Sequence, residues 1–217
     1  MRANSSYSNY QWGQSDPHTA GFLYAPLKSL LVKHGAPGSR ESPVRVLDLG
    51  CGNGALAAEM TRWGYSVVGV DPSASGVKQS RARCPDLRFF QALAEADQLA
   101  ALGLSDFDVV VSTEVVEHCY APRLWAAAAF EVLRPGGVLI CSTPYHGYLK
   151  NLALALSGKL DDHFTALWDG GHIKFWSRAT LGRLLEEAGF QITAFRGAGR
   201  CPWLWKSMLI VARKAGS

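Results

Sequence analysis

The sequence lacks a hydrophobic run long enough to cross a bilayer, and it lacks a dense cluster of Lys and Arg despite a net charge of +4. Charge therefore indicates neither nucleic acid nor a membrane surface as a partner. The five cysteines include no C-x-x-C pair, which favours reduced thiols over a disulfide framework. The first 15 residues contain no hydrophobic segment of a signal peptide. These absences predict a soluble, cytoplasmic protein, and 217 residues suit one α/β domain.

The stretch 44–54, which reads VRVLDLGCGNG, joins a short strand to a glycine-rich turn. The aliphatic and β-branched residues 44–49 predict a buried strand, and a helical pattern follows at about 53–63. The three alternating glycines therefore fall on a strand-to-helix turn. Glycine allows positive φ there and lets a ligand approach the backbone, and the next helix offers unpaired N–H groups. The turn predicts a pocket for a nucleotide-like ligand.

One carboxylate and two missing motifs narrow the kind of nucleotide. Asp71 ends the second predicted strand, 65–71, about twenty residues after Gly50, where a carboxylate can accept hydrogen bonds from a ribose diol. Ala55 stands where the G-x-G-x-x-G fingerprint of dinucleotide-binding proteins has its third glycine. The G-x-x-x-x-G-K-[ST] loop of triphosphate-binding proteins is also missing.

On these residues the sequence resembles the class I S-adenosylmethionine-dependent methyltransferases. Their first motif, D-x-G-x-G-x-G, matches residues 48–54, and their second matches residues 70–73, which read VDPS. The resemblance covers about residues 40–215. It implies an α/β, Rossmann-like fold with a seven-stranded, mostly parallel sheet, helices on both faces and an antiparallel last strand. It also implies S-adenosylmethionine as the cofactor and S-adenosylhomocysteine as its product.

The resemblance further implies which residues bind the cofactor. Asp48 would order the glycine loop or meet the methionine ammonium, and Asp71 would accept the ribose hydroxyls. No Asp stands at positions 92 or 93 to receive the adenine amino group, so backbone groups would serve there. Cys51 is expected to be a small packing residue. The expected cofactor-binding set is Asp48, Gly50, Cys51, Gly52, Asp71, Pro72, Ala94, Thr113 and Glu114.

The rest of the pattern alternates strands and helices, which implies parallel strands joined by right-handed crossovers. We expect an N-terminal arm and helix at 1–40, a cofactor domain at 41–217, and an insert at about 145–176 that caps the acceptor site. The polar arm carries Tyr7, Tyr10 and Trp12, which either dock on the domain surface or close over the cofactor. Further strands are predicted at 87–90, 107–112, 137–142, 190–195 and 207–213, and helices at about 20–34, 73–83, 95–102, 121–133 and 178–188.

The string EVVEH at 114–118 follows the fourth predicted strand and faces the pocket. Two resembled groups carry E-x-x-E-H here, the ubiquinone-biosynthesis O-methyltransferases and the small-RNA 2′-O-methyltransferases, and the latter bind a metal. Three interpretations stay open. Glu114 and Glu117 cap a turn while His118 packs in neutral form; or His118 orients or deprotonates the acceptor; or, less favoured, a divalent metal is held by Glu114, Glu117, His118 and His172.

Two further histidines are candidates for the acceptor site. His146 follows the fifth predicted strand at its carboxyl end, and His172 lies in the insert, where this fold keeps its acceptor site. Each could equally be a loop histidine bonded to nearby backbone. The insert and the loop after residue 196 also carry four tryptophans that either line an aromatic cleft or cover the core: Trp168, Trp176, Trp203 and Trp205.

These patterns favour an O-methyltransferase acting on a small hydroxylated acceptor, with His118, His146 and His172 as the candidate catalytic residues. A metal-assisted RNA ribose methyltransferase is the first alternative, but the sequence has no basic stripe to support it. An inactive binding protein of the same fold is the second. The intact Asp48, Gly50, Gly52 and Asp71 count against it. The pattern does not identify the acceptor or an oligomeric state.

Overall fold

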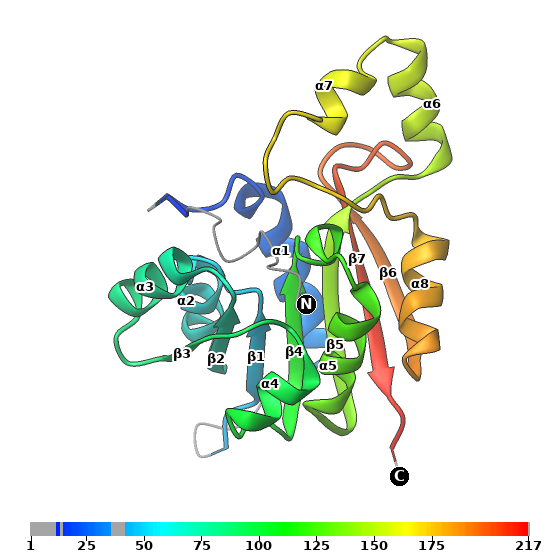
Figure 1. The fold of residues 1–217 in the computed structure, drawn as a ribbon. Coiled ribbons are helices and arrows are strands. Elements are labelled where there is room, and N and C mark those ends of the chain that lie inside the picture. The colour runs from blue at the N-terminus through cyan, green and yellow to red at the C-terminus, as the bar shows by residue number, and fades with distance from the viewer. Residues whose placement is uncertain (1–11, 14, 36–41, 217) are drawn as a thin grey trace, which may run out of the picture.

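The structure is a computed structural model that describes residues 12–13, 15–35 and 42–216. A seven-stranded sheet with the order β3-β2-β1-β4-β5-β7-β6 forms its centre (Figure 1). β7 runs antiparallel to both of its neighbours, and the other pairings are parallel, so the expected fold class is confirmed. The strands are β1 (Arg45–Leu49), β2 (Ser66–Asp71), β3 (Arg88–Gln91), β4 (Phe107–Thr113), β5 (Leu133–Pro144), β6 (Phe190–Ala198) and β7 (Ser207–Lys214).

The last two strands form an antiparallel pair at one edge of the sheet, with β7 between β5 and the edge strand β6. One strand prediction needs correction. The fifth strand begins earlier than predicted, since Leu133 already pairs with Phe107 before the register shifts to Val138 and Val109. The positive φ of Gly136, 75°, belongs to this irregular stretch, which the sequence pattern had marked as a turn.

Helices cover both faces of the sheet and create two hydrophobic cores. One core packs α4, α5 and α8 on one face, and the other packs α1, α2 and α3 on the opposite face. β4 serves both, because Val110 belongs to the first core and its neighbours Val109 and Val111 belong to the second. The helices are α1 (Ala20–His34), α2 (Ala55–Arg62), α3 (Ala74–Arg83), α4 (Ala96–Ala101), α5 (Pro122–Glu131), α6 (Tyr148–Leu156), α7 (Leu160–Phe164), α8 (Arg178–Glu187) and the 3-10 helix η2 (Val116–His118).

The insert after β5 stands beyond the carboxyl ends of the strands (Figure 1). It contains α6 and α7, two short helices that the sequence pattern did not predict. Its return segment reaches η2, where Ile173 N and Lys174 N both donate to the Glu117 carbonyl at 3.0 Å. The insert is therefore held to the end of β4. Among the described residues, no helix is both long and apolar enough to span a membrane.

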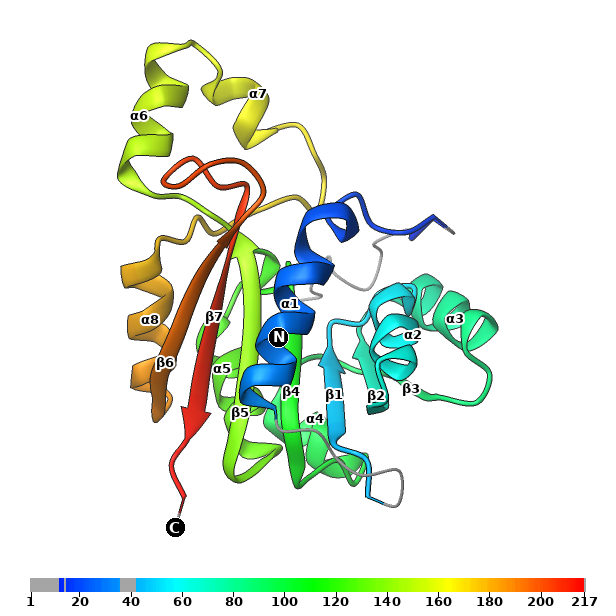
Figure 2. The same ribbon diagram turned by 180° about the vertical axis from the view of Figure 1, so that it is seen from behind.

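α1 packs along the sheet as part of the domain core (Figure 2). Leu23, Leu27, Leu30 and Leu31 are buried on one side of the helix, as their spacing predicts. Thr19 and Ala20 begin it close to the carboxyl edge of the sheet, so α1 leads the N-terminal arm toward the glycine turn (Figure 2). Tyr7 and Tyr10 lie outside the described residues.

Truncating Leu27 to Ala tests whether α1 shares the cooperative core. Leu27 is 0% exposed, so Leu27→Ala is expected to lower the free energy of unfolding by about 2–5 kcal/mol. Urea unfolding followed by far-UV circular dichroism measures this, and a single transition should move. Val32→Ala on the same helix is the control, because Val32 is 60% exposed and its loss should change stability by about 0.5 kcal/mol or less. Equal effects of the two variants would show that α1 is only an appendage.

Candidate functional site

The glycine loop is fixed to the end of β2 by backbone and carboxylate hydrogen bonds. Gly50 N and Cys51 N donate to the Val70 carbonyl at 2.8 and 3.0 Å. The Asp71 carboxylate accepts from Gly52 N through Oδ2 and from Ser73 N through Oδ1, both at 2.8 Å. Burial raises the pKa of Asp71 to about 6, although the two amide bonds oppose the rise. Asp71 therefore holds the loop in addition to its expected role toward a ribose.

Asp48 lies at the bottom of this loop without a polar partner. It is 1% exposed, and neither carboxylate oxygen finds a hydrogen-bond partner among the described residues. Burial, together with the nearby Asp71 charge, raises the pKa of Asp48 to about 8. A buried carboxylate in this state is costly unless a cation or donor from a ligand completes it.

The N-terminal arm crosses the glycine loop. The Asn53 side chain donates to the Gly13 and Ser15 carbonyls at 2.8 and 2.9 Å, which ties the arm to the start of α2. The Trp12 indole lies against Gly52, where any Cβ would collide with the ring. The arm thus lies on the loop itself. Its closure on a bound cofactor stays a prediction.

The segment after β4 joins the glycine loop to the rest of the site. A Cβ on Gly50 would collide with the Val115 side chain, so the two segments are in contact. Glu114, immediately before, has a φ of 55°, a strained value for a residue with a side chain. Its carboxylate accepts from Ser142 Oγ at 2.7 Å and Ser207 Oγ at 3.2 Å. Burial raises the pKa of Glu114 to about 7, while these hydroxyls and the Lys150 charge oppose it.

Glu117, His118 and His172 come together beside this segment. Each offers a ligand atom within 4.8 Å of the others, and the rings of His118 and His172 have centroids 4.9 Å apart. Glu117 Oε2 accepts from Thr143 Oγ1 at 3.0 Å, whereas the buried Oε1 has no hydrogen-bond partner among the described residues. Burial, then the Glu114 charge, raises the pKa of Glu117 well above its ordinary value. The metal set expected from sequence is thus only partly assembled, since Glu114 is bonded to serines instead.

The His118 ring is oriented by the insert. Its Nδ1 lies 3.1 Å from the Gly170 carbonyl and 3.2 Å from the Gly171 carbonyl. Both partners are acceptors, so Nδ1 carries the proton and Nε2 keeps a lone pair. Burial lowers the pKa of His118 below its ordinary value of 6.5, despite the two carbonyl bonds. Burial and the neighbouring His118 lower the pKa of His172 to about 4. Both rings are therefore neutral near pH 7.

His146 belongs to a separate group of side chains under the insert. Its ring centroid lies 5.2 Å from that of His163, 6.1 Å from that of Phe164 and 5.0 Å from that of Phe175. The three predicted catalytic histidines are therefore not gathered into one cluster. Of the remaining predicted residues, Pro72 and Ala94 are half-buried in the loops after β2 and β3, and Thr113 ends β4. Burial raises the pKa of the Cys51 thiol well above its ordinary value, and all five cysteines are free.

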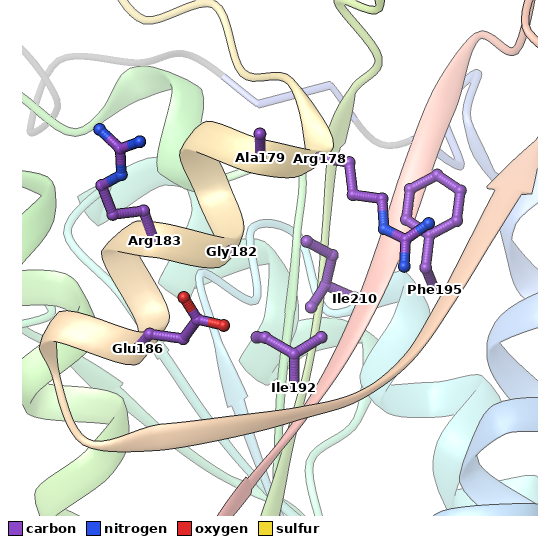
Figure 3. Close-up of a pocket in the computed structure, with 8 residues that line it drawn as sticks. All are labelled: Arg178, Ala179, Gly182, Arg183, Glu186, Ile192, Phe195 and Ile210. Carbon is purple, nitrogen blue, oxygen red and sulfur yellow. The ribbon is translucent and has the colours of Figure 1, made fainter.

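Two hollows lie outside the glycine loop. One, of about 480 Å³, is lined by α7 and the residues that follow, Phe164 and Leu167 among them, and ends at Trp168. The other, of about 290 Å³, lies between α8 and strands β6 and β7, with Arg178 and Phe195 at its rim (Figure 3). The second contains none of the predicted site residues. The first opens beside Trp168, whose ring centroid is 6.0 Å from that of His118.

Several polar side chains that lie at this edge of the sheet or beneath the insert were not singled out by the sequence analysis. Ser142 and Thr143 end a buried strand at the carboxyl edge, so the rule that ligands bind there could have identified them. Ser207 begins β7 and carries no local signal. Lys150 and His163 belong to helices of the insert that the pattern did not predict. Trp12 was noted, but its contact with Gly52 joins segments 40 residues apart and has no signature in the sequence.

The residues around Asp48 fit S-adenosylmethionine. Its methionine ammonium would complete the unpaired Asp48 carboxylate, and the Val115 and Trp12 side chains that lie against Gly50 and Gly52 would flank the methionine part. Asp71 lies at the end of β2 for the ribose hydroxyls, at the carboxyl edge where open α/β sheets bind ligands. The donor set therefore matches the cofactor that the sequence motifs imply.

Comparisons with known proteins agree with this assignment. A family model described as "Methyltransferase domain" matches residues 21–194. A ubiquinone biosynthesis O-methyltransferase of Azorhizobium caulinodans is 33% identical over 193 residues, 84% of this chain and 72% of the relative. One from Cereibacter sphaeroides is 39% identical over 75% of this chain and 67% of the relative. A third, from Dinoroseobacter shibae, is 36% identical, and the alignment spans only 60% of its length and 68% of this chain.

Solved structures share the fold at lower identity. Magnesium protoporphyrin IX methyltransferase from Synechocystis, solved with bound S-adenosylhomocysteine, superposes with a TM-score of 0.62 over 88% of this chain and 81% of that one, at 19% identity. The YcgJ protein of Bacillus subtilis gives a TM-score of 0.67 over 89% of this chain and 100% of that one, at 16% identity. These likenesses establish the fold alone.

Asp48→Asn is expected to weaken cofactor binding and stabilise the fold. Loss of the ammonium's charged partner should raise the Kd for S-adenosylhomocysteine about tenfold or more, measured by isothermal titration calorimetry. Because the pKa of Asp48 in the folded protein, about 8, lies above the ordinary 3.8, folding at pH 7 requires this carboxyl to take up a proton, which lowers stability; the amide avoids this cost and should raise the unfolding midpoint.

Asp97→Asn provides the matched control, because Asp97 is exposed on α4 and should change neither quantity. Parallel loss of affinity and stability in Asp48→Asn would instead mean that the carboxylate is structural.

Proposed function

We propose that this protein, which belongs to the methyltransferase-domain family and is an S-adenosylmethionine-dependent methyltransferase, methylates a hydroxyl oxygen of a small hydroxylated aromatic acceptor. The neutral His118, three residues after the Val115 that contacts the glycine loop, is the observation that carries the proposal. The relatives named ubiquinone biosynthesis O-methyltransferase support an oxygen acceptor.

When bound, S-adenosylmethionine supplies an activated methyl group on a sulfonium centre. The chain must therefore orient an acceptor, exclude water and remove one proton. His118 Nε2 has the free lone pair that would take up the proton of the acceptor hydroxyl. The Gly170 and Gly171 carbonyls fix the ring in the tautomer this step needs and stabilise the imidazolium that results.

Apolar side chains beside His118 support an aromatic acceptor. Trp168 contacts the His118 and His172 rings edge-on, with centroids 6.0 and 5.4 Å away. The hollow of about 480 Å³ next to it is lined by Phe164, Leu167 and Trp168. An apolar hollow with a few polar groups at one end is the usual form of a small-molecule site. Trp203 and Trp205 pack instead with each other and with Tyr145 and Phe195.

Replacing His118 by Gln tests its role as base. His118→Gln is expected to lower kcat about hundredfold or more while leaving S-adenosylhomocysteine affinity in place. Because the folded pKa lies below 6.5, the wild-type rate should be independent of pH above 6.5 and fall only at more acidic pH. His34→Gln is the control, since His34 lies on α1 far from the carboxyl edge of the sheet. A rate that keeps rising between pH 7 and 9 would identify a different base.

A divalent cation is the second use that the same cluster allows. Glu117, His118 and His172 offer one carboxylate and two neutral imidazoles, a donor set suited to Zn²⁺ or Mn²⁺. Under the proposed mechanism EDTA should leave the methylation rate unchanged, as measured by S-adenosylhomocysteine release. If EDTA abolished activity and one added metal restored it, His118 would be a metal ligand and not the base. That result would support the alternative of a metal-assisted RNA ribose methyltransferase.

A further inference from the structure

Three basic side chains from separate parts of the insert converge beneath it. His146 follows β5, Lys150 lies in the first turns of α6, and His163 lies in α7. The His146 and His163 ring centroids are 5.2 Å apart. The Lys150 charge lowers the pKa of both rings. The cluster is distinct from the Glu117, His118 and His172 group.

His146 and Lys150 are buried, His163 is half-buried, and polar atoms of the cluster lack partners in the described part of the chain. His146 is 8% exposed, and its Nδ1 has no hydrogen-bond partner among the described residues; the same is true of the buried His163 Nε2. The Asn151 side chain lies within hydrogen-bonding range of His146 and raises the pKa of its ring, although the Asn151 Oδ1 meets no partner with good geometry among the residues described. Lys150 is 5% exposed, and its ammonium donates to one carbonyl, that of Lys206, at a long 3.4 Å. Buried polar groups without partners are rare in folded proteins and call for a missing ligand or water.

The charge around the cluster is predominantly positive. Arg200, in the connection between β6 and β7, contributes a positive charge that lowers the pKa of both Lys150 and His163. The Glu114 charge raises the pKa of Lys150, but the Glu114 carboxylate already accepts hydrogen bonds from Ser142 and Ser207. Asp161 and Asp162 of α7 are exposed. Burial and the Arg200 charge lower the pKa of Lys150 to about 8, and burial and Lys150 lower that of His146 to about 4. A bound anion would relieve both effects.

We propose that His146, Lys150 and His163 form a subsite for an anionic oxygen group, a carboxylate or phosphate, carried by the methyl acceptor. The Lys150 ammonium supplies the charge, and the two neutral imidazoles each donate one N–H. Phe164 and Phe175 flank His146, with ring centroids 6.1 and 5.0 Å from its own, so an aromatic ring bearing the anion has an apolar wall beside the charged group. This inference rests on the proposed O-methylation and specifies its substrate as an acidic hydroxylated aromatic.

The test compares two acceptors that differ only in charge, 3,4-dihydroxybenzoate and 3,4-dihydroxybenzamide. The wild-type kcat/KM should favour the acid about tenfold or more, the gain of one charge-assisted hydrogen-bond set. Lys150→Met should remove this preference mainly through KM for the acid. Lys159→Met is the matched control, because Lys159 is exposed between α6 and α7 and should leave the preference intact. Titration with S-adenosylhomocysteine verifies that each variant folds and binds the cofactor.

The outcomes separate this inference from the proposed function. Equal kcat/KM for acid and amide, or a preference that survives Lys150→Met, overturns the anion subsite and leaves O-methylation in place. Methylation of neither compound by a protein that binds S-adenosylhomocysteine contradicts the proposed O-methylation itself. Inorganic phosphate, added as a competitor against the acid, distinguishes the two anions. An inhibition constant below the KM of the acid assigns the subsite to a phosphate ester, and weaker inhibition assigns it to a carboxylate.

Discussion

The Asp71 carboxylate holds the glycine loop against the end of β2, and the geometry of the site depends on this contact. Its two oxygens accept from Gly52 N and Ser73 N, so one buried side chain fixes the turns after both β1 and β2. Charge-assisted bonds of this kind are roughly twice as strong as neutral ones. With the loop held, Gly50 lies in contact with Val115 and brings the segment after β4 to the cofactor pocket. Both halves of the site are therefore positioned from the carboxyl edge of the sheet.

The cofactor half of the site could be predicted from the sequence because its residues are close together along the chain. Asp48 to Gly54 form one turn, and Asp71 ends the next strand, so a local pattern carries the geometry. The acceptor half could not, because its contacts join distant segments: Glu114 meets Ser207 across 93 residues, and His118 meets Gly170 across 52. The alternation of strands and helices predicted parallel pairing of the early strands. The insertion of β7 between β5 and β6 depends on long-range pairing that no local signal encodes.

Unpaired buried polar groups gather at this same edge. Asp48 lacks partners for both oxygens, Glu117 for one, and His146 for Nδ1, although most buried polar groups in proteins are bonded. Glu114 adds backbone strain at the end of β4. Each feature lowers stability, and the two large cores on either face of the sheet supply the compensation. Such a distribution is expected at a binding site, where polar groups are left available to a ligand and do not contribute to the stability of the fold.

The charges of the two halves oppose each other. Asp48 and Asp71 place buried carboxylates at the glycine loop, whereas Lys150 and Arg200 place positive charge beneath and beside the insert. A cofactor that carries an ammonium and a sulfonium suits the first half, and the proposed anionic acceptor suits the second. Glu114 lies between them, bonded to Ser142 and Ser207 and within range of the Lys150 charge. Because the Ser142 and Ser207 hydroxyls and the Lys150 charge all favour its carboxylate form, Glu114 links the end of β4 electrostatically to the insert.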